Sequence, residues 1–72
     1  MPIVFSEHAV IQIKQRAISK ISVVEAVKYP DSIIKSFRTR RLRDKMIGSK
    51  ILRVVTVTEG SKISIVTAYY LK

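Results

Sequence analysis

Lysines and arginines are the residues of this sequence whose number and spacing indicate a chemical role. Residues 35–53 hold eight of them and a single acid, Asp44, so this segment carries +7 of the chain's net charge of +9. Cations at this density repel one another, and neither solubility nor protection of a sheet edge requires so many. The pattern therefore favours a surface that binds a polyanion, nucleic acid above all.

The candidate nucleic-acid-binding residues are seven cations of this segment: Lys35, Arg38, Arg40, Arg41, Arg43, Lys45 and Arg53. Alternate residues of a strand point to the same face, so Arg41, Arg43 and Lys45 should form one row. A protein core cannot hold three unpaired cations. We therefore expect this row to face solvent or a bound polyanion.

The same protein could cleave RNA by promoting attack of the RNA's own 2′-hydroxyl on the neighbouring phosphate. That reaction needs a group to take the hydroxyl proton, a group to protonate the leaving 5′-oxygen, and cations beside the phosphate. The catalytic candidates are His8, Tyr69 and Arg43, and no metal or other cofactor is expected. His8 is the single histidine, the residue type suited to proton transfer near neutral pH. Its structural alternative is a surface residue near a helix N-terminus.

Tyr69 also has two interpretations, which the sequence leaves open. Thr67 and Tyr69 fall on one face of the last expected strand, together with Ile63 and Ile65. If this is the core face, Tyr69 packs with its hydroxyl at the rim. If it is the exposed face, Thr67 and Tyr69 stand at the open end of the sheet beside the arginines.

Two helices are expected ahead of the strands. Ser6 precedes a segment without Gly or Pro and is the predicted N-cap of the first helix. Ser22 and Glu25 have the spacing of a capping box, which predicts the start of the second helix. Pro30 should end that helix near Tyr29.

Four strands are expected after the helices, at about 32–38, 41–47, 50–58 and 62–71. Gly48-Ser49 and Glu59-Gly60-Ser61 suit tight hairpin links, whereas the turn near Thr39 has no glycine. Short links between sequential strands predict antiparallel pairing. The expected fold is α+β, with two N-terminal helices packed on one face of a four-stranded antiparallel sheet.

Three other residues are given structural roles. Phe5 and Phe37 are expected in the core. Arg16 lies at the edge of the apolar stripe of the first helix and is expected to pair with Glu25 or Asp31, locking the helices together. Apolar residues outside that stripe leave a homodimer open.

Length and composition limit the number of domains, the kinds of site and the classes of protein that remain. With 72 residues the chain has room for one core, so residues 1–72 should form one domain. The chain has no Cys, which excludes disulfides, and its single His disfavours a metal cage. The apolar start is too brief for a signal peptide, and no apolar run approaches the roughly 18 residues that cross a bilayer. We expect a soluble cytoplasmic protein that does not bind membranes.

Four ordered segments resemble a family of small uncharacterised prokaryotic domains, related in turn to RelE- and BrnT-type toxins of toxin–antitoxin systems. The segments are Phe5-Ser6-Glu7-His8-Ala9, Arg16-Ala17-Ile18-Ser19, Tyr29-Pro30-Asp31-Ser32-Ile33 and Ile65-Val66-Thr67-Ala68-Tyr69. The resemblance implies a RelE-like ribonuclease-toxin fold whose exposed sheet face cradles RNA. One departure is Ala17, where a glycine commonly stands, and it puts the link between the helices in doubt.

The leading expectation is an RNA-interacting, RelE-like protein of toxin type, which could be a metal-independent endoribonuclease of the mRNA-interferase kind. The resemblance also implies neutralisation by an acidic antitoxin. Two alternatives use the same cations: a non-catalytic protein that binds RNA or DNA, and a protein-interaction module that docks an acidic partner.

Overall fold

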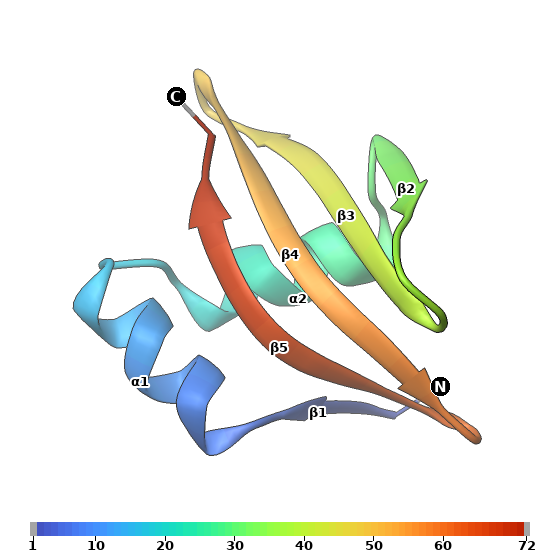
Figure 1. The fold of residues 1–72 in the computed structure, drawn as a ribbon. Coiled ribbons are helices and arrows are strands. Elements are labelled where there is room, and N and C mark those ends of the chain that lie inside the picture. The colour runs from blue at the N-terminus through green and yellow to red at the C-terminus, as the bar shows by residue number, and fades with distance from the viewer. Residues whose placement is uncertain (1, 72) are drawn as a thin grey trace.

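A five-stranded mixed sheet with two helices on one face forms the protein in the computed structural model, which describes residues 2–71 (Figure 1). The elements are β1 (Ile3–Phe5), α1 (Glu7–Gln15), α2 (Lys20–Lys28), β2 (Ser32–Lys35), β3 (Arg40–Ile47), β4 (Lys50–Glu59) and β5 (Lys62–Tyr70). The strand order is β1-β5-β4-β3-β2, and all neighbouring pairs are antiparallel except β1 with β5. The α+β class with N-terminal helices on one face is confirmed.

The prediction of a four-stranded antiparallel sheet is wrong because it omits β1. This strand has only three residues, Ile3–Phe5, which are too few to show alternation in the sequence. It is held by parallel pairing with β5, from Ile3 opposite Ile63 to Phe5 opposite Ile65. The extra strand leaves β5 inside the sheet along its first half and exposes an edge of β5 only beyond Ile65.

The two helices begin at serine caps. The predicted cap Ser6 is confirmed, since its hydroxyl accepts a hydrogen bond from the amide of Ala9 at 3.0 Å. The predicted cap Ser22 is wrong: Ser19 caps α2 and its hydroxyl accepts from the amide of Ser22 at 3.1 Å. Both serines have cap chemistry, and starting at Ser19 adds Lys20, Ile21 and Ser22 to the helix. The helix ends before Pro30, as expected.

The link between the helices turns at Ala17, whose φ is +55°. The amide of Ile18 donates to the carbonyl of Ile13 at 2.8 Å, a bond typical of a helix end closed by a left-handed residue. Glycine adopts this φ without steric cost, whereas alanine does not. The link therefore forms with alanine, under backbone strain, at the position where the resemblance expects glycine.

A β-bulge reverses the faces of β5 halfway along its length. Opposite the neighbouring residues Val55 and Thr56 of β4 lie Thr67 and Ile65, so one residue of β5 is extra. Ile65 is fully buried beneath the helices, whereas Thr67 and Tyr69 point to the other side. Thr67 and Tyr69 share one face, as expected, but the expectation that Ile63 and Ile65 lie on the same face with them is wrong.

The core lies between the helices and the sheet, so the two sheet faces differ. The helix-covered face packs against α1 and α2, and the open face is turned toward the viewer in Figure 1. The core residues are Ala9, Ile13, Ile18, Val23, Ala26, Val27, Leu52, Val54, Ile63, Ile65 and Ala68. None of the helices within residues 2–71 is long and apolar enough to cross a membrane.

Candidate nucleic-acid interface

The predicted row of Arg41, Arg43 and Lys45 exists, but it lies on the helix-covered face. Its members pair across the sheet with three fully buried residues of β4: Thr56, Val54 and Leu52. All three cations are half-buried rather than exposed. The expectation that the row faces solvent or a polyanion is therefore wrong, because α2 packs on this side of β3 and β4.

Arg43 and Lys45 bind the end of α2. The Arg43 guanidinium donates from Nη1 to the carbonyl of Val27 at 3.2 Å and from Nε to Thr56 Oγ1 at 3.1 Å. Lys45 Nζ donates to the carbonyl of Tyr29 at 3.0 Å. Burial, followed by the charge of nearby Arg41, lowers the pKa of Arg43. Cations satisfy the last carbonyls of a helix and interact favourably with its dipole, so these two residues hold α2 on the sheet.

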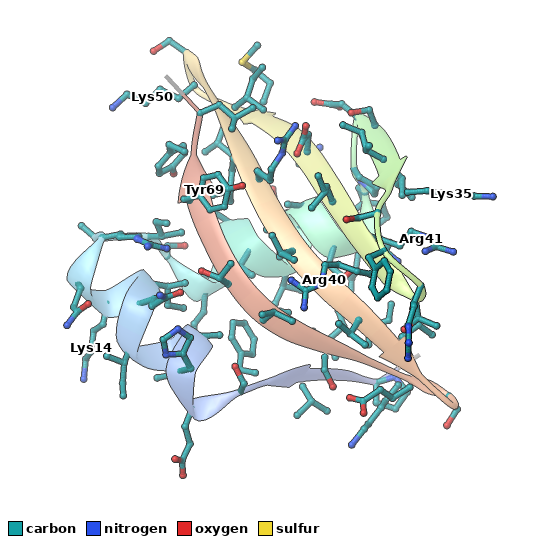
Figure 2. All side chains as sticks on the ribbon, viewed as in Figure 1. Lys14, Lys35, Arg40, Arg41, Lys50 and Tyr69 are labelled. Carbon is teal, nitrogen blue, oxygen red and sulfur yellow. The ribbon has the colours of Figure 1, made fainter. Side chains whose placement is uncertain are left out.

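Arg53 and Tyr69 lie next to each other on the open face, with Asp44. Arg53 donates from Nε and Nη2 to the two carboxylate oxygens of Asp44, both at 2.9 Å. The hydrogen bond with Asp44 raises the pKa of Arg53; burial opposes this shift and Tyr69 adds to it. Tyr69 is opposite Arg53 in the β4–β5 register and extends across the open face (Figure 2). The charge of Arg53 is thus already matched by an acid.

Arg16 joins α1 to β5 rather than to α2. Its Nη1 donates to Thr67 Oγ1 at 3.1 Å and to the carbonyl of Ala68 at 2.9 Å, so the expected pairing with Glu25 or Asp31 is wrong. Thr67 Oγ1 in turn donates to Gln12 Oε1. The bond to Ala68 gives a partner to a backbone carbonyl in the part of β5 that β1 does not cover.

The three catalytic candidates do not all lie on one surface. Arg43 is on the helix-covered face and Tyr69 is on the open face. His8 is an exposed residue in the first turn of α1. Within residues 2–71, no three side chains of the His, Cys, Asp and Glu types lie close enough to hold a metal ion.

The other four candidate cations are gathered in one hairpin. Residues 35–41, here called the basic hairpin, join β2 to β3 and contain Lys35, Arg38, Arg40 and Arg41 but no acid. Lys35, Arg38 and Arg40 are exposed. Figure 2 shows Lys35 and Arg41 projecting from the β2–β3 side of the molecule, while Arg40 lies over the sheet. Arg41 donates from Nη1 to the carbonyls of Arg38 and Arg40, both at 3.0 Å.

Phe37 at the tip of the basic hairpin was expected in the core, and this expectation is wrong. β2 ends at Lys35, three residues before the predicted end, and the Phe37 side chain is 73% exposed. The guanidinium carbon of Arg38 stands 5.1 Å from the centre of its ring. The ring belongs to a shallow hollow of about 180 Å³ whose lining is Phe37, Arg38, Thr39, Arg40 and Val57. The sequence signal was an aromatic residue followed directly by basic residues at a turn.

The structure thus divides the seven candidate cations by their partners. Two bind the end of α2, one is paired with Asp44, and four belong to the hairpin that carries the exposed Phe37 ring. Of the three groups, only the last contains exposed cations, and the hairpin that holds them has no acid. The basic hairpin is therefore the candidate interface.

Comparison with known proteins bears on the family and not on the activity. Searches of curated proteins and of solved structures find no significant match. A family model, Domain of unknown function (DUF4258), matches residues 5–70, from the end of β1 to the end of β5. The chain therefore belongs to the DUF4258 family of domains of unknown function.

Proposed function

We propose that this protein binds RNA through the basic hairpin. The observation that carries the proposal is the gathering of four cations and no acid in residues 35–41. Three of the four are exposed. A polyanion bound there releases counterions, which supplies most of the affinity of such interfaces.

The hydrogen bonds of the basic hairpin leave its charge available. Arg41 donates to neutral backbone carbonyls, so it keeps its full positive charge while its position is set. Arg53, by contrast, is matched by the Asp44 carboxylate. Charge without a local counter-charge favours an anionic ligand at the hairpin more than at the centre of the open face.

The resemblance to RelE- and BrnT-type toxins favours RNA over other polyanions. It also makes a RelE-like variant of the observed α+β fold part of this proposal. The strand order places the basic hairpin at the margin of the open face, so RNA that enters from the hairpin can run toward Arg53 and Tyr69.

The test is a titration of labelled RNA by fluorescence anisotropy at several salt concentrations. Lys35→Ala and Arg40→Ala should each weaken binding and lower the slope of log affinity against log salt by about 0.7 to 1 for each phosphate that is no longer neutralised. Lys14→Ala and Lys62→Ala remove the same charge from exposed sites outside the hairpin and serve as matched controls. Equal losses in all four variants, or no binding at low salt, would contradict the proposal.

A second candidate function is metal-independent RNA cleavage, which is favoured by the placement of Tyr69 on the open face beside Arg53. In this reaction the 2′-oxygen loses its proton to a base and forms a bond to the neighbouring phosphorus. The bond from phosphorus to the 5′-oxygen breaks, a second proton passes to that oxygen, and a 2′,3′-cyclic phosphate remains. Tyr69 and His8 remain the candidates for these transfers. Arg43 does not, because it holds α2.

Incubation of RNA in EDTA, with and without ribosomes, tests this second function. Tyr69→Phe or His8→Ala should slow cleavage by about 100-fold or more if the residue transfers a proton. Lys14→Ala is the control and should leave the rate unchanged. Absence of cleavage by the unmodified protein, or an undiminished rate in both variants, would overturn the catalytic proposal.

A further inference from the structure

The tip of the basic hairpin is held in a strained conformation. Arg38 has a φ of +56°, in the left-handed region that costs energy for any residue except glycine. The strained residue is fixed by its neighbours: Arg41 Nη1 donates to its carbonyl at 3.0 Å, and the amide of Arg40 donates to the carbonyl of Phe37 at 3.0 Å. Backbone strain that the surroundings maintain is characteristic of ligand-binding positions.

In this conformation the Arg38 guanidinium lies beside an aromatic ring that is not part of the hydrophobic core. Phe37 is 73% exposed and takes no part in the core. The Arg38 guanidinium lies over one face of the ring at 5.1 Å from its centre, and most of Phe37 remains exposed. The adjoining hollow of about 180 Å³ reaches from this ring to Val57 of β4.

We propose that the basic hairpin recognises single-stranded RNA by stacking one unpaired base on Phe37, with Arg38 and Arg40 on the flanking phosphates. This inference rests on the proposed RNA binding and names its substrate class. An aromatic ring beside cations is the arrangement by which proteins hold single strands: the ring takes the base face and the cations follow the backbone.

Duplex RNA does not fit this arrangement. The faces of a paired base inside a helix are covered by its neighbours, so only loops, bulges and ends offer a face to Phe37. A duplex can still contact the cations of the basic hairpin through its phosphates. Stacking therefore predicts discrimination between single and double strands, which charge alone does not supply.

The first experiment compares a single-stranded RNA oligonucleotide with the same sequence in a duplex, by anisotropy at one salt concentration. Phe37→Leu should weaken single-strand binding about tenfold, a typical loss for one stacked base, and leave duplex binding unchanged. Because Phe37 lies outside the core, the variant should keep the unfolding midpoint of the parent protein, which is checked by urea titration. An equal loss of affinity for the single strand and the duplex, or no loss of affinity for either, would overturn the stacking proposal.

The second experiment observes the stacking directly. The sequence contains no tryptophan, so Phe37→Trp introduces a single indole at the tip of the hairpin. Its emission should be quenched on addition of the single strand, and Phe37→Trp should bind that strand at least as tightly as the parent protein does. Tyr29→Trp places an indole at a site that is 69% exposed, at the end of α2, and is the matched control.

The outcomes separate this inference from the proposed function. Quenching in Phe37→Trp but not in Tyr29→Trp supports stacking. Binding of RNA with equal quenching, or none, at the two sites overturns stacking while leaving RNA binding intact. No binding of either RNA to the parent protein at low salt overturns both.

Discussion

Arg43 and Lys45 of β3 follow the basic hairpin closely in the sequence, yet they have different partners from the cations of the hairpin. Arg43 and Lys45 donate to the carbonyls of Val27 and Tyr29 at the end of α2. Arg40, only three residues before Arg43, is exposed and lies over the sheet (Figure 2). The difference shows that a basic residue on a strand can be a structural contact or stay exposed, depending on whether a helix ends beside it.

The reason lies in the unpaired carbonyls at a helix C-terminus. These groups carry partial negative charge and have no partner within the helix. A guanidinium that reaches them supplies the missing hydrogen-bond donor. The basic hairpin meets no helix end. Its charge therefore has no helix carbonyl as a partner, whereas the charge of Arg43 is used within the fold.

The largest expected effect that tests this contrast is the loss of stability in Arg43→Met. The variant leaves the Val27 carbonyl and the Thr56 hydroxyl without their donor, which should lower the free energy of unfolding by about 2 kcal/mol. Arg40→Met is the matched variant and should change it by less than about 0.5 kcal/mol. Urea unfolding measures both, and similar losses would show that the two arginines have similar roles.

Asp44→Ala should have the next largest effect, and it tests the open face. Asp44 is 8% exposed, and its carboxylate holds Arg53 by two hydrogen bonds. Its removal leaves the half-buried guanidinium without its acid and should cost about 1.5 kcal/mol in urea unfolding. The freed charge of Arg53 should also tighten RNA binding. Tighter binding with unchanged stability would mean that the pair contributes nothing to the fold.

A double-mutant cycle between Arg43 and Thr56 should give a smaller effect. Thr56 is fully buried; its hydroxyl accepts from Arg43 Nε at 3.1 Å and donates to the carbonyl of Arg41 at 3.3 Å. Combining Thr56→Val with Arg43→Met should show a coupling of about 1 kcal/mol. The same cycle with Arg40→Met should show none, and additive losses in the first cycle would remove Thr56 from the contact.

The smallest effect compares the two strained turns. Ala17→Gly and Arg38→Gly should each raise the free energy of unfolding by about 0.5 kcal/mol, because relief of the left-handed strain slightly exceeds the entropy cost of glycine. Only Arg38→Gly should weaken RNA binding. Weaker binding in both, or in neither, would break the distinction between a structural turn and a binding turn.

Much of the local structure was predictable because it depends on short-range chemistry. Ser6 caps α1 and Pro30 stops α2 as expected. The two-residue link Gly48-Ser49 sets the β3–β4 register, with Gly48 at a φ of +64°, and this register brings Asp44 opposite Arg53. That ion pair could have been derived from the turn length alone, since counting back equally from both sides of the link reaches these two residues.

Other parts of the candidate site could not be read from local patterns. The bulge in β5 moves Thr67 and Tyr69 to the face opposite Ile65, and one extra residue in a strand leaves no mark on its composition. Phe37 was assigned to the core because aromatic residues usually are buried. Its exposure follows from the end of β2 at Lys35, which depends on how the hairpin closes.

The sequence by itself determined the class of fold, the cap of α1, the hairpin links and the concentration of charge in residues 35–53. Each of these depends on residues close together in the chain. Only the tertiary structure decided which cations are used within the fold and which stay exposed. That choice depends on where the end of α2 meets β3, a contact between segments that are distant in the sequence and whose energy no local pattern records.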